Sequence, residues 1–235
     1  MAVQKEATRR QFVSFTLYKV LPEWRRLSLT EREDQRREFA ETIRKWQLTD
    51  TIKVLTYSLA GMRAEGDFLL WRICYSLDCL QEMSSDLLRT RLAGYVTIPV
   101  SYLGITRHSQ YLIGEETGRS DMMSVIKPGG CKYLFVYPMV RARNWYVLPF
   151  EQRKAMVGEL ARLGNEFPRV HLNVTYSFGL DDQEFVVAIE TDHPEEFVER
   201  VIRIREMEIG PYIQRDTPSF TCIRTSLEDM LERIG

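Results

Sequence analysis

The chain carries the same strand–turn–strand pattern twice, and this repeat constrains its fold more than any other feature. The stretches "LTYSLAGMRAEGDFLLWRI" (55–73) and "VTYSFGLDDQEFVVAIETD" (174–192) both place Thr-Tyr-Ser before a polar turn and an apolar second strand. The offset that relates Tyr57 to Tyr176 also relates Tyr18 to Tyr137. A constant offset over this length predicts two copies of one structural unit.

The elements around each hairpin follow the same order. Alternating and β-branched runs predict strands, whereas apolar stripes at a spacing of three to four residues predict helices. Each half therefore reads β-α-β-β-α-β. The first half has strands at 11–20, 51–60 and 66–76 and helices at 30–46 and 77–94. The second has strands at 131–140, 169–179, 182–192 and 212–223 and helices at 149–164, 193–207 and 226–234.

This order is typical of a ferredoxin-like unit, an antiparallel sheet with both helices on one face. The strand runs "FLLWRI" and "FVVAI" are apolar on both faces, so each sheet is expected to be covered on both sides. We predict an α+β fold of two tandem ferredoxin-like repeats packed sheet to sheet, as in dimeric α/β-barrels. The expected divisions are an N-terminal repeat at 1–96, a Gly-rich polar linker at 97–130 and a C-terminal repeat at 131–235.

Composition excludes several classes of function. The formal net charge of -1 gives no preference for nucleic acid. No stretch approaches the roughly 20 apolar residues of a membrane span, and the N-terminal residues lack the apolar run of a signal peptide. The four cysteines form no CxxC pair and are expected to be reduced thiols. These features predict a cytoplasmic protein.

Motifs for common chemistries do not occur. There is no HExxH, P-loop or GxGxxG, and the histidines at 108, 171 and 193 are scattered. The pair Asp181-Asp182 follows Gly179-Leu180, which favours a turn with local backbone hydrogen bonds over a carboxylate dyad.

The segment "YPMVRARNWY" (137–146) is more unusual, because it gathers aromatic and arginine side chains where a strand ends. Arginines beside aromatic rings suit a planar ligand with carboxylates. On these residues alone, core aromatics with arginines at the rim are the favoured interpretation.

Three segments together resemble the chlorite dismutase superfamily of dimeric α+β barrels, which includes the coprohaem decarboxylases. They are "YPMVRARNWYVLPFEQR", "YSFGLDDQEF" and "RIREMEIGPYI", and the resemblance is clearest over 131–224. It implies a homo-oligomer, commonly a pentamer, with haem or coprohaem in the C-terminal half of each subunit. It also implies a haem-dependent oxidoreductase.

The resemblance assigns roles residue by residue. Tyr137 matches the tyrosine that is oxidised in coprohaem decarboxylases and is the catalytic candidate. Arg141 and Arg205 match positions near the porphyrin propionates, and Trp145 matches a tryptophan near the ring. Glu208 matches the glutamate that supports the iron-ligating histidine.

The chain departs from the family at both axial positions of the iron. In the family, the expected histidine lies on a helix with an "EHxxxG"-like motif. The corresponding sequence here is "VGELARLGNEF" (157–167). Matching Glu159 and Gly164 to that motif puts Leu160 at the histidine position, whereas a count without gaps puts Glu159 there. Glu159 is then the candidate oxygen ligand for the metal. The distal polar position falls near Leu172, which is assigned to the cofactor pocket.

The retained pocket residues and the changed axial positions together leave two possible functions. The first is a haem- or porphyrin-binding oxidoreductase that uses the retained pocket residues. The second is a haem-free scaffold or small-ligand-binding protein with no cofactor, which has lost the family's catalysis along with its axial ligand.

Overall fold

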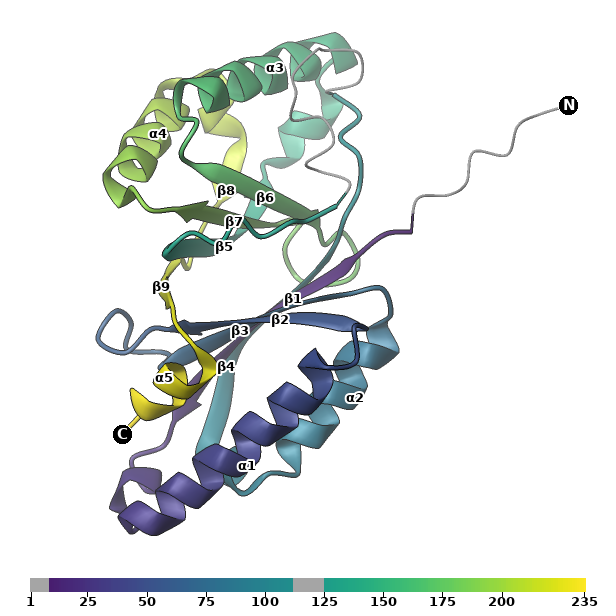
Figure 1. Ribbon diagram of the computed structural model, residues 1–235. Coiled ribbons are helices and arrows are strands. Elements are labelled where there is room, and N and C mark those ends of the chain that lie inside the picture. Colours follow the sequence, from purple (N-terminus) through teal and green to yellow (C-terminus); the bar gives the residue numbers. More distant parts are fainter. Residues whose placement is uncertain (1–8, 112–124) are drawn as a thin grey trace, which may run out of the picture.

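The computed structural model describes residues 9–111 and 125–235, and it confirms the order β-α-β-β-α-β in both halves. Figure 1 shows two lobes whose sheets face each other and whose helices lie on the outside. The first repeat contains β1 (Phe12–Val20), α1 (Leu29–Gln47), β2 (Ile52–Ser58), β3 (Phe68–Cys74), α2 (Leu77–Leu88) and β4 (Val96–Ile105). The second contains β5 (Tyr133–Arg141), α3 (Phe150–Glu166), β6 (His171–Tyr176), β7 (Phe185–Thr191), α4 (Pro194–Glu206), β8 (Ile213–Arg215) and β9 (Phe220–Arg224), and α5 (Leu227–Glu232) ends the chain.

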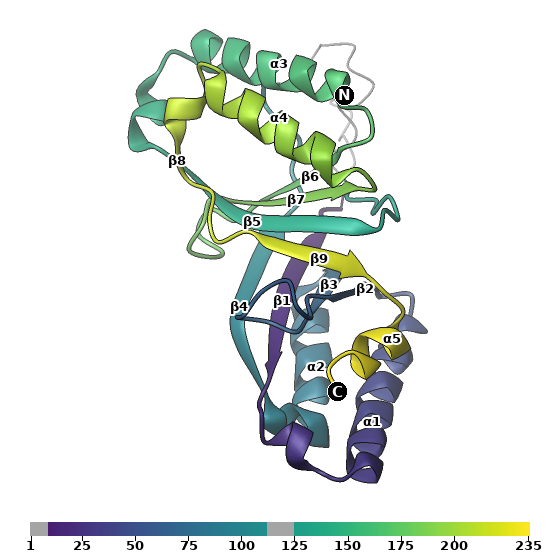
Figure 2. The same ribbon diagram turned by 90° about the vertical axis from the view of Figure 1, so that its left-hand side faces the viewer.

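Two boundaries differ from the expected ones. The predicted linker 97–130 begins inside β4, because its first residues continue the strand as far as Ile105. Part of that linker, 112–124, lies outside the described residues. Helix α5, expected with the second repeat, packs instead against the first, close to α1 (Figure 2). The apolar side chains of α5 cover an edge of the first repeat that would otherwise be exposed. The sequence pattern alone does not show where that edge lies.

The sheets of the two repeats are hydrogen-bonded to each other at both edges. The facing sheets therefore form a closed barrel. Within the described residues the strand order is β7-β6-β4-β1-β3-β2-β9-β5-β8, and an additional β7–β5 pairing closes all strands except β8 into a ring. Buried side chains such as Phe15, Trp71, Leu134, Val136 and Phe220 fill the space between the sheets. The rings of Phe15 and Trp71 stack with their centroids 5.1 Å apart.

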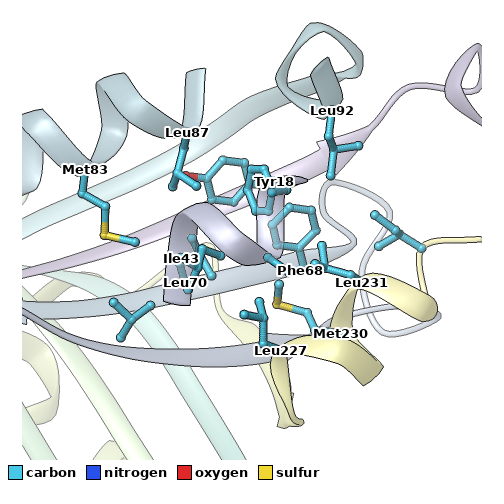
Figure 3. Packing of buried hydrophobic residues seen from close by; sticks show 14 of the residues in the cluster. Tyr18, Ile43, Phe68, Leu70, Met83, Leu87, Leu92, Leu227, Met230 and Leu231 are labelled. Atoms are coloured by element: carbon cyan, nitrogen blue, oxygen red, sulfur yellow. The ribbon is translucent and has the colours of Figure 1, made fainter. Parts of the chain in front are cut away.

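The helix-facing side of the first sheet is closed by packing alone (Figure 3). Tyr18 stacks on Phe68 at 4.7 Å and meets Phe39 edge to face at 6.3 Å. Side chains from α1, α2 and α5 complete this layer, including Ile43, Met83, Leu87, Met230 and Leu231. The first repeat therefore supplies a rigid, apolar half of the molecule.

The seam between β4 and β6 is short, and side chains from the β6–β7 turn reinforce it. Only Ile105 and Tyr176 are register partners among the described residues of these strands. Both backbone groups of Leu103 are bound across the seam: its N–H donates to Asp181 Oδ2 at 2.8 Å, and its carbonyl accepts from the Ser177 hydroxyl at 2.7 Å. Asp181 Oδ1 also accepts from the N–H of Asp182 at 2.9 Å, so the predicted turn chemistry is confirmed. The same carboxylate thus links the two repeats.

We expect Asp181→Ala to lower the free energy of unfolding by about 1.5–3 kcal/mol, because it removes an ionised acceptor from the Leu103 N–H and from Gln183 Nε2. Asp182→Ala is the matched control, since Asp182 is exposed, and its effect should stay within about 0.5 kcal/mol. Urea unfolding at one protein concentration measures both. Equal effects of the two variants would show that Asp181 acts only within the turn.

Candidate functional site

The candidate site is a cavity between the outer face of the second sheet and helices α3 and α4. It has a larger part of about 540 Å³ and a smaller part of about 100 Å³. Both parts are lined by Met139, Arg141, Leu160, Leu172 and Val174, so the two parts are continuous. Alternation along β5 and β6 turns every second side chain to this face. On α3 the residues that line it, 153, 157 and 160, lie on one helical face.

Arg141 lines both parts of the cavity, and its charged side chain is only 6% exposed. Its guanidinium lies 4.7 Å from the centroid of the Trp145 ring. Its backbone N–H donates to Glu184 Oε2 at 2.7 Å, and the Tyr146 hydroxyl donates to the same oxygen at 2.6 Å. Nη1 of Arg141 is buried without a hydrogen-bond partner among the described residues.

Burial lowers the pKa of the Arg141 guanidinium below its ordinary value, although nearby tyrosine and glutamate side chains act in the opposite direction. An arginine nevertheless stays protonated at neutral pH. A buried cation with an unused donor is costly unless an acceptor reaches it. A ligand carboxylate entering the cavity would supply that acceptor.

The rest of the larger part is basic and aromatic. Arg153 donates to the Tyr111 hydroxyl at 3.0 Å, and the Tyr111 ring stacks on Phe150 at 5.5 Å. No aspartate or glutamate of the described residues lines this part. Its arginines are Arg10, Arg107, Arg141 and Arg153. This lining suits a flat apolar molecule that carries several negative charges.

The smaller part contains Tyr137 and the end of α4. Burial raises the pKa of Tyr137 to about 12, with Arg200 and Arg205 opposing the rise. Tyr137 is therefore a neutral phenol at neutral pH. Arg205 also lines this part, and it donates to Asp216 Oδ2 at 2.7 Å, so its charge already has a partner.

The structure thus brings together five residues singled out from the sequence: Tyr137, Arg141, Trp145, Leu172 and Arg205. It separates the other two from them. Glu159 and Glu208 are exposed and line neither part of the cavity. Helical geometry turns Leu160, and not its neighbour Glu159, toward the sheet. Glu208 follows the end of α4, and the next residue, Ile209, lines the smaller part in its place.

Several lining residues were not found from the sequence. Arg153 and Val157 were missed, although they form an i, i+4, i+7 stripe with Leu160, which the sequence had already singled out. Tyr111 and Arg107 fall in the region expected to be a linker, so no pattern pointed to them. Met139 and Arg200 line the cavity as well, but their residue types alone give no sign of this.

Comparisons with known proteins bear directly on this site. The family model for chlorite dismutase matches residues 32–225. This chain belongs to the chlorite dismutase family. It is 29% identical over 187 residues to a coproheme decarboxylase of Mycolicibacterium smegmatis, covering 76% of this chain and 75% of that protein.

Solved structures show the same fold in other members. A chlorite dismutase variant from Candidatus Nitrospira defluvii superposes with a TM-score of 0.87 at 22% identity, covering 95% of this chain and 94% of that one. A heme-binding protein from Thermus thermophilus superposes with a TM-score of 0.83 at 22% identity, covering 94% of this chain and 95% of that one. At these identities the likeness concerns the fold.

Two further results concern the described residues only. None of their helices combines the length and the apolar character needed to cross a membrane. Nor do any three of their His, Cys, Asp and Glu side chains gather so that they could hold a metal ion.

The family's iron porphyrin fits this cavity in part. The apolar lining and the unpartnered Nη1 of Arg141 suit the ring and a carboxylate of such a ligand. The two positions that the resemblance relates to the axial ligands do not suit iron, because Leu160 on α3 and Leu172 on β6 offer no atom that can coordinate a metal. The residues therefore fit the organic part of the cofactor and not the coordination of its metal.

The burial of Tyr137 predicts a pH dependence of stability. Its folded pKa of about 12 lies above the roughly 10 of an exposed tyrosine, so the stabilisation is complete below pH 10 and is lost as the pH rises toward 12. We expect the free energy of unfolding of the wild type to fall by about 2 kcal/mol more than that of Tyr137→Phe over this window. Urea unfolding at several pH values measures the difference. Tyr75→Phe, at an exposed tyrosine, should retain the wild-type dependence.

Proposed function

We propose that this protein binds a carboxylated porphyrin, such as haem or coprohaem, in the cavity between the second sheet and helices α3 and α4. The observation that carries the proposal is the buried Arg141 guanidinium, which lines the cavity and whose Nη1 has no hydrogen-bond partner among the described residues. Membership of the chlorite dismutase family and the coproheme decarboxylase relative support the same ligand class.

Each part of the lining would have a separate task. The apolar side chains from β5, β6 and α3 would contact the faces of the ring and keep water away from it. Arg141 and Arg153 would hold carboxylates at one side of the ring, each braced against an aromatic side chain. Tyr137, in the smaller part, is the residue that the family resemblance assigns to catalysis, and its oxidoreductase role belongs to this proposal.

The assembly and the location are also proposals. We infer a homo-oligomer, a pentamer by family resemblance, in the cytoplasm. The exposed apolar side chains of Val198 and Ile202 on α4 suit contact with another subunit. Sedimentation of the purified chain measures the number of subunits.

A porphyrin titration tests the proposed binding. Purified full-length protein is mixed with increasing haem or coprohaem while the Soret band is followed. We expect saturation at one porphyrin per chain and a Kd in the micromolar range or below. No spectral change at tens of micromolar porphyrin would reject the proposal and leave the haem-free scaffold.

Arg141→Met tests the residue that carries the proposal, because methionine keeps an apolar stem and removes the charge. We expect affinity for coprohaem to fall by about 10- to 100-fold, as for the loss of one hydrogen bond to a charged group. Arg143→Met is the matched control, since Arg143 is exposed and lines neither part of the cavity. Its affinity should equal that of the wild type. Equal losses in both variants would show a general charge effect and no specific contact.

A further inference from the structure

The two parts of the cavity meet where aliphatic side chains face each other from the helix and from the sheet. Leu160 of α3 and Leu172 of β6 line both parts, together with Val174 and Met139. A metal at the centre of a bound ring would have only saturated carbon atoms next to it on the side of α3 and on the side of β6. Neither leucine can donate an electron pair to it.

The usual ligands of a porphyrin metal are excluded by position. All the histidines and cysteines of the chain fall within the described residues, and none of them lines either part of the cavity. His108 stands between the lining residues Arg107 and Ser109, but it is exposed and is not part of the lining. His171 stands one residue before Leu172. Successive strand residues point to opposite faces, and a Cβ on Gly129 would meet the His171 ring at 3.8 Å, away from the cavity.

The other donors in the lining are poor ligands here. The Asp216 carboxylate accepts from Arg205, and the hydroxyls of Tyr146 and Tyr111 are bound to Glu184 and Arg153. Burial also raises the pKa of Tyr176 above its ordinary value. A tyrosine coordinates a metal as a phenolate, whereas burial keeps Tyr137 protonated by raising its pKa to about 12. The Met139 thioether remains, but a single thioether is a weak ligand when no stronger one shares the metal. The lining therefore offers nothing that distinguishes an iron porphyrin from a metal-free one through coordination.

We infer that this site recognises the carboxylated ring and not its metal, so that it takes metal-free porphyrin as tightly as iron porphyrin. The inference rests on the proposed porphyrin binding and specifies its ligand class. In a site with an axial histidine, the bond to iron adds affinity that a metal-free ring cannot gain. Between two leucines that gain is missing, and a water bound to ferric iron would have to be buried or lost against apolar side chains.

The first test uses the wild-type chain and two ligands that differ only at the centre. Metal-free coproporphyrin III is followed by its fluorescence and coprohaem by its absorbance. We expect Kd values within about threefold of each other. A Kd for coprohaem at least tenfold lower would overturn the inference while supporting the proposed function. Binding of neither ligand would reject the proposed function itself.

The second test installs the missing ligand. Leu160→His places an imidazole on the face of α3 that lines the cavity, and we expect it to tighten coprohaem at least tenfold with a shift of the Soret band. Its affinity for metal-free coproporphyrin III should change by less than twofold. Glu159→His is the matched control, because position 159 is exposed, and it should change neither affinity.

The third variant, Met139→Leu, examines the remaining donor. An unchanged ratio of the two Kd values would support the inference. A selective loss of coprohaem affinity in this variant would show that the thioether coordinates the iron, which would overturn it.

Discussion

The seam at Leu103 is the constraint on which the second half of the molecule depends. The Asp181 carboxylate and the Ser177 hydroxyl bind the two backbone groups of this β4 residue and so hold β4 against β6. The chain beyond β4 then supplies Arg107 and Tyr111 to the cavity of the other repeat. A contact between repeats thus determines which side chains reach the ligand site.

Duplication has given the two repeats different tasks on the same framework. Tyr18 and Tyr137 occupy equivalent strands and both face the helices, as the constant offset indicates. Around Tyr18, aromatic neighbours and side chains of α1, α2 and α5 pack closely, and the cavity beside it measures only about 30 Å³. Around Tyr137 no such additional helix covers the described part of the sheet, and a cavity remains. The last helix, α5, packs on the first repeat, and a cavity remains on the helix side of the second sheet.

The sequence predicted the order of elements and the facing sheets because both depend on local periodicity. It did not predict the extent of β4 or the position of α5, since these depend on which edges stay uncovered after the repeats meet. In the site, the family resemblance pointed to Arg141 and Leu172, and both line the cavity because alternation along β5 and β6 turns them to the same face. Glu159 does not line it, because a shift of one residue on a helix rotates the side chain by about 100°. Resemblance to a family locates a helix more surely than the face of that helix.

The charged side chains of this protein are distributed unevenly, and the net charge of -1 does not reveal this distribution. The larger part of the cavity collects arginines without a carboxylate from the described residues, while Arg205 and Asp216 neutralise each other in the smaller part. Arg141 is buried with no partner for Nη1 from residues 9–111 and 125–235, and such burial of a cation is destabilising. A carboxylate that enters removes this destabilisation and adds a charge-assisted hydrogen bond, so both effects favour the bound state. In the proposed complex, affinity and orientation therefore arise from the rim of the ligand, whereas Leu160 and Leu172 present only saturated carbon to the cavity.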